Sequence, residues 1–496
     1  MESKSQLQVS NSGQQSGGST FLETCFNGLN SLLGVGILSI SYAVSQGGWL
    51  SFILLFIFAM MCWYTALLLQ RCMDGNPQIK SYPDIGQVAF GYKGRAVVAS
   101  IIYMELFLIA VELLILEGDN LEKLFPSVNF TIAGLRIGGK RGFIMLSALV
   151  ILPTTWLRSL GVLAYISVGG VLASIILLGC VVWVGEVDSV GFHERGHFVN
   201  WGGMPTALSI FSFCFCVHAV LPTLINSMKD RSQSFKVMLV CFVAGTIVYG
   251  SIAIVGYMMF GECLMSQITL NLPTGKKSTK IAIYTAIIYP LTRYAVIITP
   301  IANAIEGKSL LCKSRPIAIL IRTIIVVSTV LMALFIPFFG YIMALIGAFL
   351  DVAISLLFPC LCYLKINKDA RRFGFELIVI VGILLIGSFI GILGTYISLR
   401  QIGRALNWLE LQHADSISTW EELVEKFQKK FFPLSQFSEL KEQIGNLKQL
   451  EGESLSRGSI GEITPPRAVE LIEKMTSEDN EVTPVQPKRG IMQLEG

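Results

Sequence analysis

The feature that most constrains this chain is a series of eleven apolar segments, each about as long as a membrane-spanning helix. Spanning the hydrocarbon core of a bilayer takes about 20 predominantly apolar residues. Charged residues make up only 15% of the 496 residues, against about 25% in soluble domains, so the chain lacks the polar side chains that cover a water-facing surface. This excludes a water-soluble enzyme and predicts an all-α polytopic membrane protein with about eleven transmembrane helices. The predicted spans lie near residues 21–44, 48–70, 96–117, 142–157, 161–185, 204–226, 235–260, 279–300, 318–337, 339–363 and 375–398.

The distribution of Lys and Arg predicts the orientation of these spans, because cytosolic loops carry an excess of basic residues. With the amino terminus in the cytosol, the cytosolic loops hold 16 basic residues and the opposite loops hold eight. Residues after 398 then lie on the lumenal or extracellular side. Asn129, in the sequon Asn129-Phe130-Thr131, falls in a non-cytosolic loop and is a candidate glycosylation site.

The eleven cysteines predict neither a disulfide framework nor a metal site. Most of them lie inside apolar segments, where a pair such as Cys214 and Cys216 is far more often two small hydrophobic residues. No pairing of nucleophile and base is recognisable either, so we expect no enzyme activity, no metal and no organic cofactor. The polar residues 1–19 precede the first span, so we expect no cleaved signal peptide.

The first span is rich in glycine and small polar residues. Such residues favour local unwinding, and unwound backbone in a membrane is tolerated only where it lines a cavity, so that its free N–H and C=O groups can hold a zwitterion. The same residues also suit close packing of one helix on another. On the first interpretation, the candidate substrate-binding residues of this span are Asn30, Ser31, Gly34, Val35 and Gly36.

The sixth span has a matching interruption before Pro222. Proline removes a helical hydrogen bond, and Cys214, Cys216 and His218 precede it as further candidates for substrate binding. If spans 1–5 and 6–10 are inverted repeats, the first and sixth spans occupy corresponding places, and two broken helices indicate a substrate site at mid-membrane. His218 is equally explained by a structural hydrogen bond, and it also titrates in a range that suits carrying or sensing a proton.

Ionisable residues inside spans are functional candidates because burying a charge is costly. Glu105 and Glu112 are seven residues apart in the third span, so they share one helical face and should point into the bundle. Arg293 lies in the eighth span and Asp351 in the tenth. Glu105, Glu112, Arg293 and His218 are our candidates for proton coupling or gating. Arg293 either supplies a fixed cation at a coupling-ion site or forms a structural ion pair with one of the carboxylates.

A set of short motifs runs through the spans in consistent order. They are the run from Asn27 to Leu38 with Gly47-Gly48-Trp49, Ser81-Tyr82-Pro83-Asp84-Ile85-Gly86, Leu116-Glu117-Gly118-Asp119-Asn120-Leu121, His218-Ala219-Val220-Leu221-Pro222 with Ser227-Met228-Lys229-Asp230, Pro290-Leu291-Thr292-Arg293-Tyr294-Ala295, and Thr299-Pro300. Over about residues 21–398 the chain thereby resembles the amino acid/auxin permease family, and within it the plant vacuolar amino acid transporters. The resemblance implies a LeuT-like inverted-repeat core, proton-coupled transport of amino acids, and substrate contacts around residues 31–36 and 214–218.

Three positions depart from the pattern of that family. The family usually has a proline where this chain has Ser41 and a glycine where it has Val217, and Val217 adds bulk beside the expected site. Relatives often carry lysine at the position of Arg293. Arginine keeps the charge but resists deprotonation, so a proton-shuttling role for Arg293 is disfavoured.

Residues 401–496 differ in composition from the rest of the chain. They hold 11 basic and 16 acidic residues, against 27 and 18 in residues 1–400, and lack long apolar runs. Stretches such as Glu421-Glu422-Leu423 and Phe431-Phe432-Pro433 resemble the Gag polyprotein of plant gypsy-type retrotransposons. Alone, residues 421–430 predict only an amphipathic helix. We interpret the segment as a transposon insertion or gene fusion without transport function; a tolerated lumenal appendage is the alternative.

The expected organisation is a polar cytosolic tail over residues 1–20, a transporter domain over 21–398, a Gag-like helical fragment over 399–455 and a disordered tail over 456–496. The expected function is secondary active transport of neutral amino acids by alternating access, with the proton as coupling ion. A membrane amino acid sensor and an inactive transporter–retrotransposon fusion are the alternatives. We expect the vacuolar membrane as the location, with the plasma membrane or another endomembrane as the alternative. The net negative tail predicts no nucleic-acid partner, and the sequence leaves the oligomeric state open.

Overall fold

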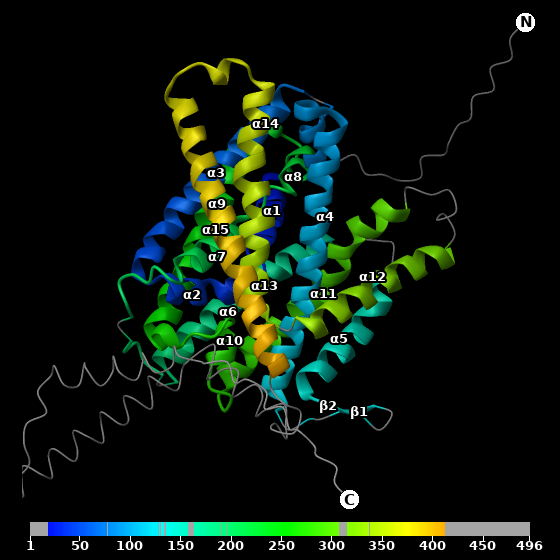
Figure 1. Ribbon diagram of the computed structural model, residues 1–496, viewed down its shortest axis with the longest axis vertical. Helices are drawn as coiled ribbons and strands as arrows, with labels where there is room; N and C mark the ends of the chain where they lie inside the picture. The colour runs from blue at the N-terminus through cyan, green and yellow to red at the C-terminus, as the bar shows by residue number, and fades with distance from the viewer. Residues whose placement is uncertain are drawn as a thin grey trace, which may run out of the picture. The chain divides into compact units, whose positions relative to one another are not determined.

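The computed structural model describes residues 18–411, with gaps at residues 77, 127, 129, 133–134, 157–162, 189, 195, 307–314 and 337. Predictions for Asn129, for the first 17 residues and for residues 412–496 lie outside the described residues. The described chain is almost entirely helical (Figure 1). Its α-helices are α1 (Phe21–Leu32), α2 (Gly36–Gly47), α3 (Trp49–Asp74), α4 (Tyr82–Leu124), α5 (Gly139–Thr155), α6 (Leu163–Glu186), α7 (Met204–Phe215), α8 (Leu221–Ser227), α9 (Ser234–Phe260), α10 (Ile268–Asn271), α11 (Lys277–Glu306), α12 (Arg315–Phe335), α13 (Phe339–Leu345), α14 (Phe358–Ile366) and α15 (Phe375–Leu411).

Each of the eleven predicted spans corresponds to one helix or to helices in series. Among the described residues, eight helical segments are individually long and apolar enough to cross a membrane, and the bent pair α1–α2 makes a ninth. The other two predicted spans are α5, with 17 residues, and the interrupted pair α7–α8. The class of all-α polytopic membrane protein is thereby confirmed. The described sheet is one small hairpin, in which β1 (Phe130–Ile132) pairs antiparallel with β2 (Leu135–Ile137).

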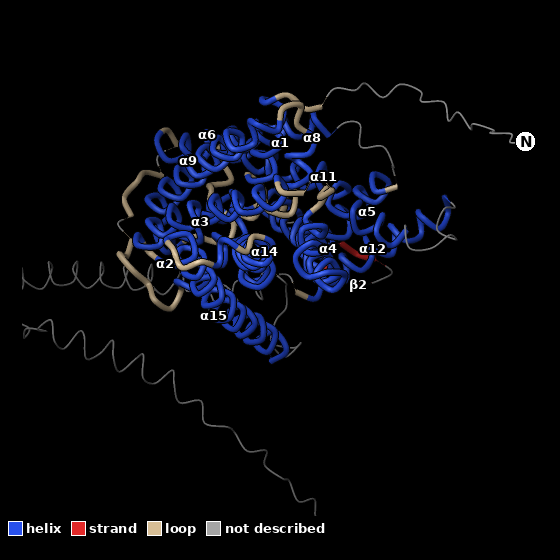
Figure 2. Tube along the Cα trace, turned by 90° about the horizontal axis from the view of Figure 1, so that it is seen from above, coloured by secondary structure: helices blue, strands red, loops and turns tan. Residues whose placement is uncertain are grey.

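The helices pack in two groups. α4, α5, α11 and α12 contact one another, and α2 and α3 contact each other and both pack against α7 and α9. Figure 2 shows these groups on opposite sides of the bundle, with α14 between them. α6 contacts α1, α9 and α11, so it joins the broken first span to the first group.

The first span is broken, as its composition predicts. α1 and α2 meet at 50°. The Leu33 N–H makes the last α-helical bond of α1, to the Leu29 carbonyl oxygen, whereas the Gly34 N–H leaves this pattern by donating to the Leu32 carbonyl oxygen. Close approach requires glycine at position 36, since a Cβ there would lie 2.6 Å from the Cys214 sulfur. The unwinding interpretation and the close-packing interpretation therefore both apply to this segment.

The sixth span is also broken, but not at its proline. α7 ends at Phe215 and α8 begins at Leu221, so Pro222 lies in the first helical turn of α8. A first-turn N–H has no helical acceptor, so proline is well tolerated there. The break accordingly falls before the proline, over residues 216–220, and includes Cys216 and His218.

The tenth span contains two stretches of π-helix between α13 and α14. These are η4 (Ile346–Asp351) and η5 (Ala353–Leu357). A π-helical turn is rare and frequently occurs at functional sites. Here it carries Asp351, one of the ionisable residues expected inside a span.

The third and last spans extend beyond their predicted bounds. α4 begins at Tyr82 and changes direction at Gly91, which has a φ of 70°. α15 continues to Leu411, past the boundary expected at residue 398. Ile402 and Ala405 of this extension pack in a buried cluster with Tyr341 of α13, so apolar contacts stabilise the additional turns.

Candidate functional site

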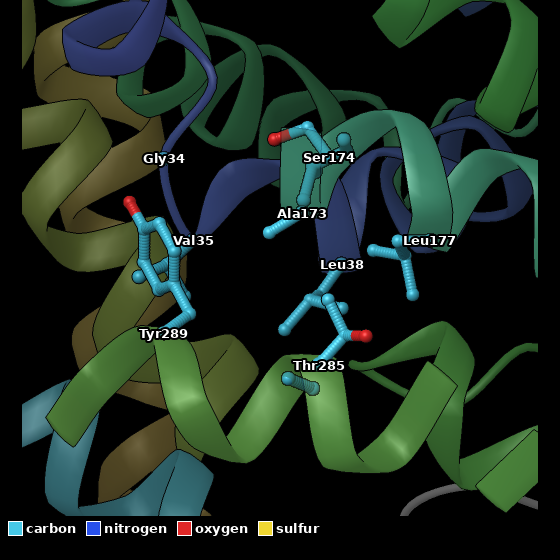
Figure 3. Close-up of a pocket in the computed structure, with 10 residues that line it drawn as sticks. Gly34, Val35, Leu38, Ala173, Ser174, Leu177, Thr285 and Tyr289 are labelled. Atoms are coloured by element: carbon cyan, nitrogen blue, oxygen red, sulfur yellow. The ribbon is translucent and has the colours of Figure 1, made fainter. Parts of the chain in front are cut away.

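A small pocket lies beside the break in the first span (Figure 3). Figure 3 shows Tyr289 and Thr285 of α11 facing Ala173 and Ser174 of α6 across it. Its cavity volume of about 20 Å³ is room for a single water molecule. The residues that line it are Gly34, Val35, Ile37, Leu38, Ala173, Ser174, Leu177, Thr285, Ala286 and Tyr289.

The predicted residues of the first span divide between this pocket and other contacts. Gly34 and Val35 line the pocket. Asn30 is buried against α6, where its side-chain oxygen occupies the space a Cβ at Gly170 would need. The Ser31 hydroxyl donates to the Asn27 carbonyl oxygen at 2.9 Å. The structure thus brings two of the five candidates to the pocket, while Gly36 faces α7.

Gly36, Cys214 and Tyr249 form a junction between the two breaks. The Cys214 thiol donates to the Gly36 carbonyl oxygen at 3.7 Å. The Tyr249 hydroxyl of α9 lies 2.5 Å from the carbonyl oxygen of Leu32 and 3.2 Å from that of Cys214. A single buried hydroxyl therefore binds carbonyl groups that the ends of α1 and α7 leave without helical partners.

Arg293 reaches the break from α11. Its Nη1 donates to the Tyr289 hydroxyl, and its guanidinium lies 5.0 Å from the centre of the Tyr289 ring. A Cβ at Gly34 would be 3.9 Å from Arg293 Nη1. In the part of the chain that the structure describes, the ion pairs do not include Arg293. The structural ion pair considered for Arg293 is thus not formed within that part.

Glu105 of α4, Cys216 at the end of α7 and Asp351 of η4 converge. One ligand atom of each lies within 4.8 Å of the others, and the Cys216 thiol is 3.9 Å from Glu105 Oε1. Glu105 and Asp351 are 6% and 1% exposed, so both carboxyl groups are out of water. Among the described residues, this group is the one set of three Asp, Glu, His or Cys side chains whose oxygen and sulfur atoms approach this closely. It offers three ligands, whereas structural zinc takes four.

Glu112 and His218 lie close to this group but have different surroundings. Glu112 is fully buried, and neither of its carboxyl oxygens has a hydrogen-bond partner among the described residues. His218 Nε2 lies 3.1 Å from the Cys62 carbonyl oxygen and 3.0 Å from the Thr65 hydroxyl. A carbonyl oxygen only accepts, so these partners assign the proton to Nε2. His218 therefore faces α3 and does not line the pocket at Gly34.

Two buried residues that hold these helices together, Tyr249 and Arg322, were not identified from the sequence. Tyr249 carries no local signal beyond being a tyrosine in an apolar span. Arg322 lies inside the predicted ninth span, and a single arginine in an apolar run could have indicated it. It is 2% exposed and bonds to Glu306 at 3.0 Å, to the Thr155 carbonyl oxygen at 2.8 Å and to Asn303 at 3.2 Å. This network joins α5, α11 and α12.

Comparisons with known proteins identify the family of this chain. The family described as transmembrane amino acid transporter protein matches residues 17–400. Amino acid transporter AVT1I of Arabidopsis thaliana is 48% identical over 388 residues, covering 78% of this chain and 96% of that protein. The vesicular GABA transporter of Caenorhabditis elegans is 27% identical over 410 residues, covering 78% and 80%. Among solved structures, MhsT in complex with L-phenylalanine aligns with a TM-score of 0.48 and 14% identity, over 78% of this chain and all of that one.

The family match covers the whole helical bundle, including both broken helices. The relatives named by the comparison are transporters, which are not enzymes. The chain therefore belongs to the transmembrane amino acid transporter family and is an integral membrane transporter.

Proposed function

We propose that the chain is a secondary active transporter that moves neutral amino acids across a membrane by alternating access, driven by a proton gradient. The observation that carries this proposal is the pair of broken helices whose ends meet at Gly36 and Cys214. Membership of the amino acid transporter family supports the substrate class. The preference for neutral amino acids and the coupling to protons rest on the arguments that follow.

The break in the first span suits the charged ends of an amino acid. The Ile37 and Leu38 N–H groups in the first turn of α2 donate to carbonyl oxygens of the break, and the amino terminus of this helix favours an anion such as a carboxylate. Arg293 adds a positive charge beside Gly34. The ammonium group would then compete with the Tyr249 hydroxyl and the Gly34 N–H for the Leu32 carbonyl oxygen at the end of α1.

The walls of the pocket support a neutral side chain. Val35, Leu38, Ala173 and Leu177 supply apolar surface, and the polar atoms come from hydroxyl groups of Ser174, Thr285 and Tyr289. No carboxylate lines this pocket, as far as its described lining shows. A basic side chain would therefore lack a counter-charge there.

The cavity volume supports transport by movement of the helices. About 20 Å³ is far smaller than an amino acid, so α6 and α11 must separate from the broken span to admit substrate. Because residue 34 is a glycine, no side chain from this position occupies the space beside the break. Alternating access then consists of opening this region first toward one face of the membrane and then toward the other.

Buried carboxyl groups support the proton as coupling ion. Proton relays in transporters use Asp, Glu and His side chains within spans, and Glu105, Glu112 and Asp351 are all buried in the bundle. The resemblance to plant vacuolar transporters supports a vacuolar location, and an acidic vacuole would supply the gradient. A plasma membrane or other endomembrane location is the alternative.

The carboxyl-terminal segment is dispensable on this proposal. The family match ends at residue 400, and both breaks lie well inside it, so we expect the site to function without residues 412–496. We attribute no transport step to the Gag-like segment.

The test is uptake of radiolabelled amino acids into proteoliposomes by the full chain and by a chain ending at residue 411. Neutral, acidic and basic amino acids are compared with and without an imposed pH difference. Gradient-dependent uptake of neutral amino acids by both chains is the expected result. Uptake by the short chain alone would show that residues 412–496 impair transport. If neither chain transports but an amino acid raises the unfolding temperature, a sensor role replaces transport.

A further inference from the structure

Beyond the substrate pocket, the structure contains a second arrangement built from three distant parts of the chain. Glu105 belongs to α4, Asp351 to the π-helical segment η4 and Cys216 to the break after α7, and their ligand atoms lie within 4.8 Å of one another. We propose that Glu105 and Asp351 together bind the transported proton and that Cys216 reports its presence to the substrate site. This inference rests on the proposed proton-coupled transport and names the residues that perform the coupling.

Two buried carboxylates at this separation cannot both be ionised. Like charges a few ångströms apart in a low-dielectric environment repel strongly, and a pair of this kind takes up one proton between its members. Each has one oxygen, Oε2 of Glu105 and Oδ1 of Asp351, that is buried without a hydrogen-bond partner among the described residues. A proton can bind to these oxygens, because none of the described residues donates a hydrogen bond to them. The loaded pair holds one proton and one negative charge.

Among the described residues, no cationic side chain forms an ion pair with either carboxyl group. Gly391 of α15 lies against Ala348 of η4, and the Ser355 hydroxyl donates to the Asp351 carbonyl oxygen. The titratable groups that interact electrostatically with the pair are Cys62 of α3, Glu112 of α4, and Cys214 and Cys216 of α7 and its break. His218 lies one contact further away, against the Cys62 carbonyl oxygen.

The geometry also connects the pair to the break that binds substrate. The Cys216 thiol donates to Glu105 Oε1 at 3.9 Å, and two residues earlier the Cys214 thiol donates to the Gly36 carbonyl oxygen at 3.7 Å. Residues 214–216 thus contact the proton pair at one end and the start of α2 at the other. Release of the proton leaves two repelling carboxylates, which separates Glu105 from Asp351 and draws the end of α7 away from α2.

The π-helical turns allow this movement. A π-helical turn contains more residues than an α-helical turn, so the α-helical hydrogen-bond pattern is interrupted around Asp351. The segment can therefore change toward α-helical geometry with only a small shift of the Asp351 carboxyl group. A regular helix would hold Asp351 in one place. Proton binding is therefore coupled to substrate binding by a local change of this segment between two conformations, and one bound proton shifts their populations.

The experiment uses the full-length chain in proteoliposomes and two assays with labelled alanine. Counterflow at equal pH exchanges labelled for unlabelled alanine, so it requires binding and alternating access but no gradient. Gradient-driven uptake measures accumulation, and with one proton per alanine a difference of one pH unit supports up to about tenfold accumulation. We expect Glu105→Gln and Asp351→Asn to retain counterflow but to lose accumulation, so that the inside and outside concentrations become equal.

The matched control is Glu117→Gln, which changes another buried carboxyl group of α4 that lies outside the pair. It should retain both activities. Cys216→Ser should accumulate less alanine than the unaltered chain. Accumulation by both amide variants at the level of the unaltered chain would overturn the proposal, and so would accumulation driven by a sodium gradient at equal pH. Absence of counterflow in the unaltered chain would instead contradict the proposed transport function.

A swapped pair and a spectroscopic measurement keep the proposal testable if an amide variant does not fold. Glu105→Asp combined with Asp351→Glu retains two carboxyl groups and should restore accumulation; a folded swapped pair with counterflow and no accumulation contradicts the assignment. Infrared spectroscopy of the unaltered chain in lipid should show a protonated carboxyl band that disappears as the pH rises. A band that persists unchanged over the pH range in which transport is lost would also overturn it.

Discussion

The Cys214 thiol donates to the Gly36 carbonyl oxygen across 3.7 Å, although the two residues are 178 positions apart in the chain. This contact joins the end of α7 to the start of α2, where both spans lose their helical hydrogen bonds. The free backbone groups of both breaks are thereby held in one region, and Tyr249 binds Leu32 and Cys214 from the other side. The predictions below follow from the packing around this region.

Substituting Gly36 should obstruct the junction directly. A Cβ at this position would lie 2.6 Å from the Cys214 sulfur and 3.3 Å from the Tyr249 hydroxyl, and overpacking of this kind costs about 1–3 kcal/mol. Gly36→Ala should therefore lower the unfolding temperature and reduce alanine counterflow. Gly382→Ala in α15 is the control, since nothing lies within 4 Å of its Cβ position. Equal behaviour of the two variants would remove the junction from the mechanism.

Gly34 should tolerate a small side chain but not a large one. The nearest atoms to a Cβ there are the Tyr289 hydroxyl at 3.5 Å and Arg293 Nη1 at 3.9 Å, which is ordinary packing distance. Gly34→Ala should fold and retain part of the uptake. Gly34→Leu should insert into the membrane normally yet abolish uptake, because its side chain fills the pocket. Unchanged uptake by Gly34→Leu would show that substrate does not pass this break.

Arg293 should affect apparent substrate affinity through its charge and its geometry. Losing one hydrogen bond to a charged group costs about 1.5–3 kcal/mol, which raises KM roughly tenfold or more. We expect this increase for Arg293→Gln in uptake assays over a range of alanine concentrations. Arg293→Lys keeps the charge but loses the planar stacking on Tyr289, so its KM should be intermediate. A KM that neither substitution changes would exclude contact between Arg293 and the carboxylate.

Arg322 should contribute to stability rather than to substrate binding. It is buried and bonded to Glu306, Asn303 and the Thr155 carbonyl oxygen, and removing one partner of a buried ion pair costs about 3–5 kcal/mol. Arg322→Gln should lower the unfolding temperature of the purified protein markedly, and adding Glu306→Gln should recover part of the loss. Arg372→Gln is the control, since its pair with Asp369 is exposed and exposed pairs contribute at most about 1 kcal/mol. Similar shifts for both arginines would contradict this assignment.

Several features of the fold could be predicted because they depend on local sequence. Runs of apolar residues mark the spans, and Gly34 with Gly36 marks the break in the first span. The interruption predicted before Pro222 coincides with the break over residues 216–220, while Pro222 itself lies in the first turn of α8, where proline is tolerated. The apolar run weakens near residue 398, where the sequence predicts the end of the last span. The helix α15 continues past this residue, because Ile402 and Ala405 pack against Tyr341.

The partners of the buried polar groups could not be predicted. Glu105 and Glu112 were expected to be buried, and both are, but the sequence does not indicate that Glu105 meets Asp351 while Glu112 meets no described partner. Arg293 was considered as the partner of a carboxylate and instead contacts Tyr289 beside Gly34. The sequence leaves open whether His218 has a structural or a proton-carrying role. In the structure His218 contacts the Cys62 carbonyl oxygen and the Thr65 hydroxyl.

The sequence by itself determined which segments lie in the membrane, where helices break, and to which family of transporters the chain is similar. These properties are local, because a bilayer without water requires every spanning segment to be apolar and to satisfy its own backbone. The tertiary structure decided which side chains meet. Contacts such as Cys216 with Glu105 and Asp351 depend on how each helix is rotated and on the π-helical turns of span ten, and packing between distant segments determines both.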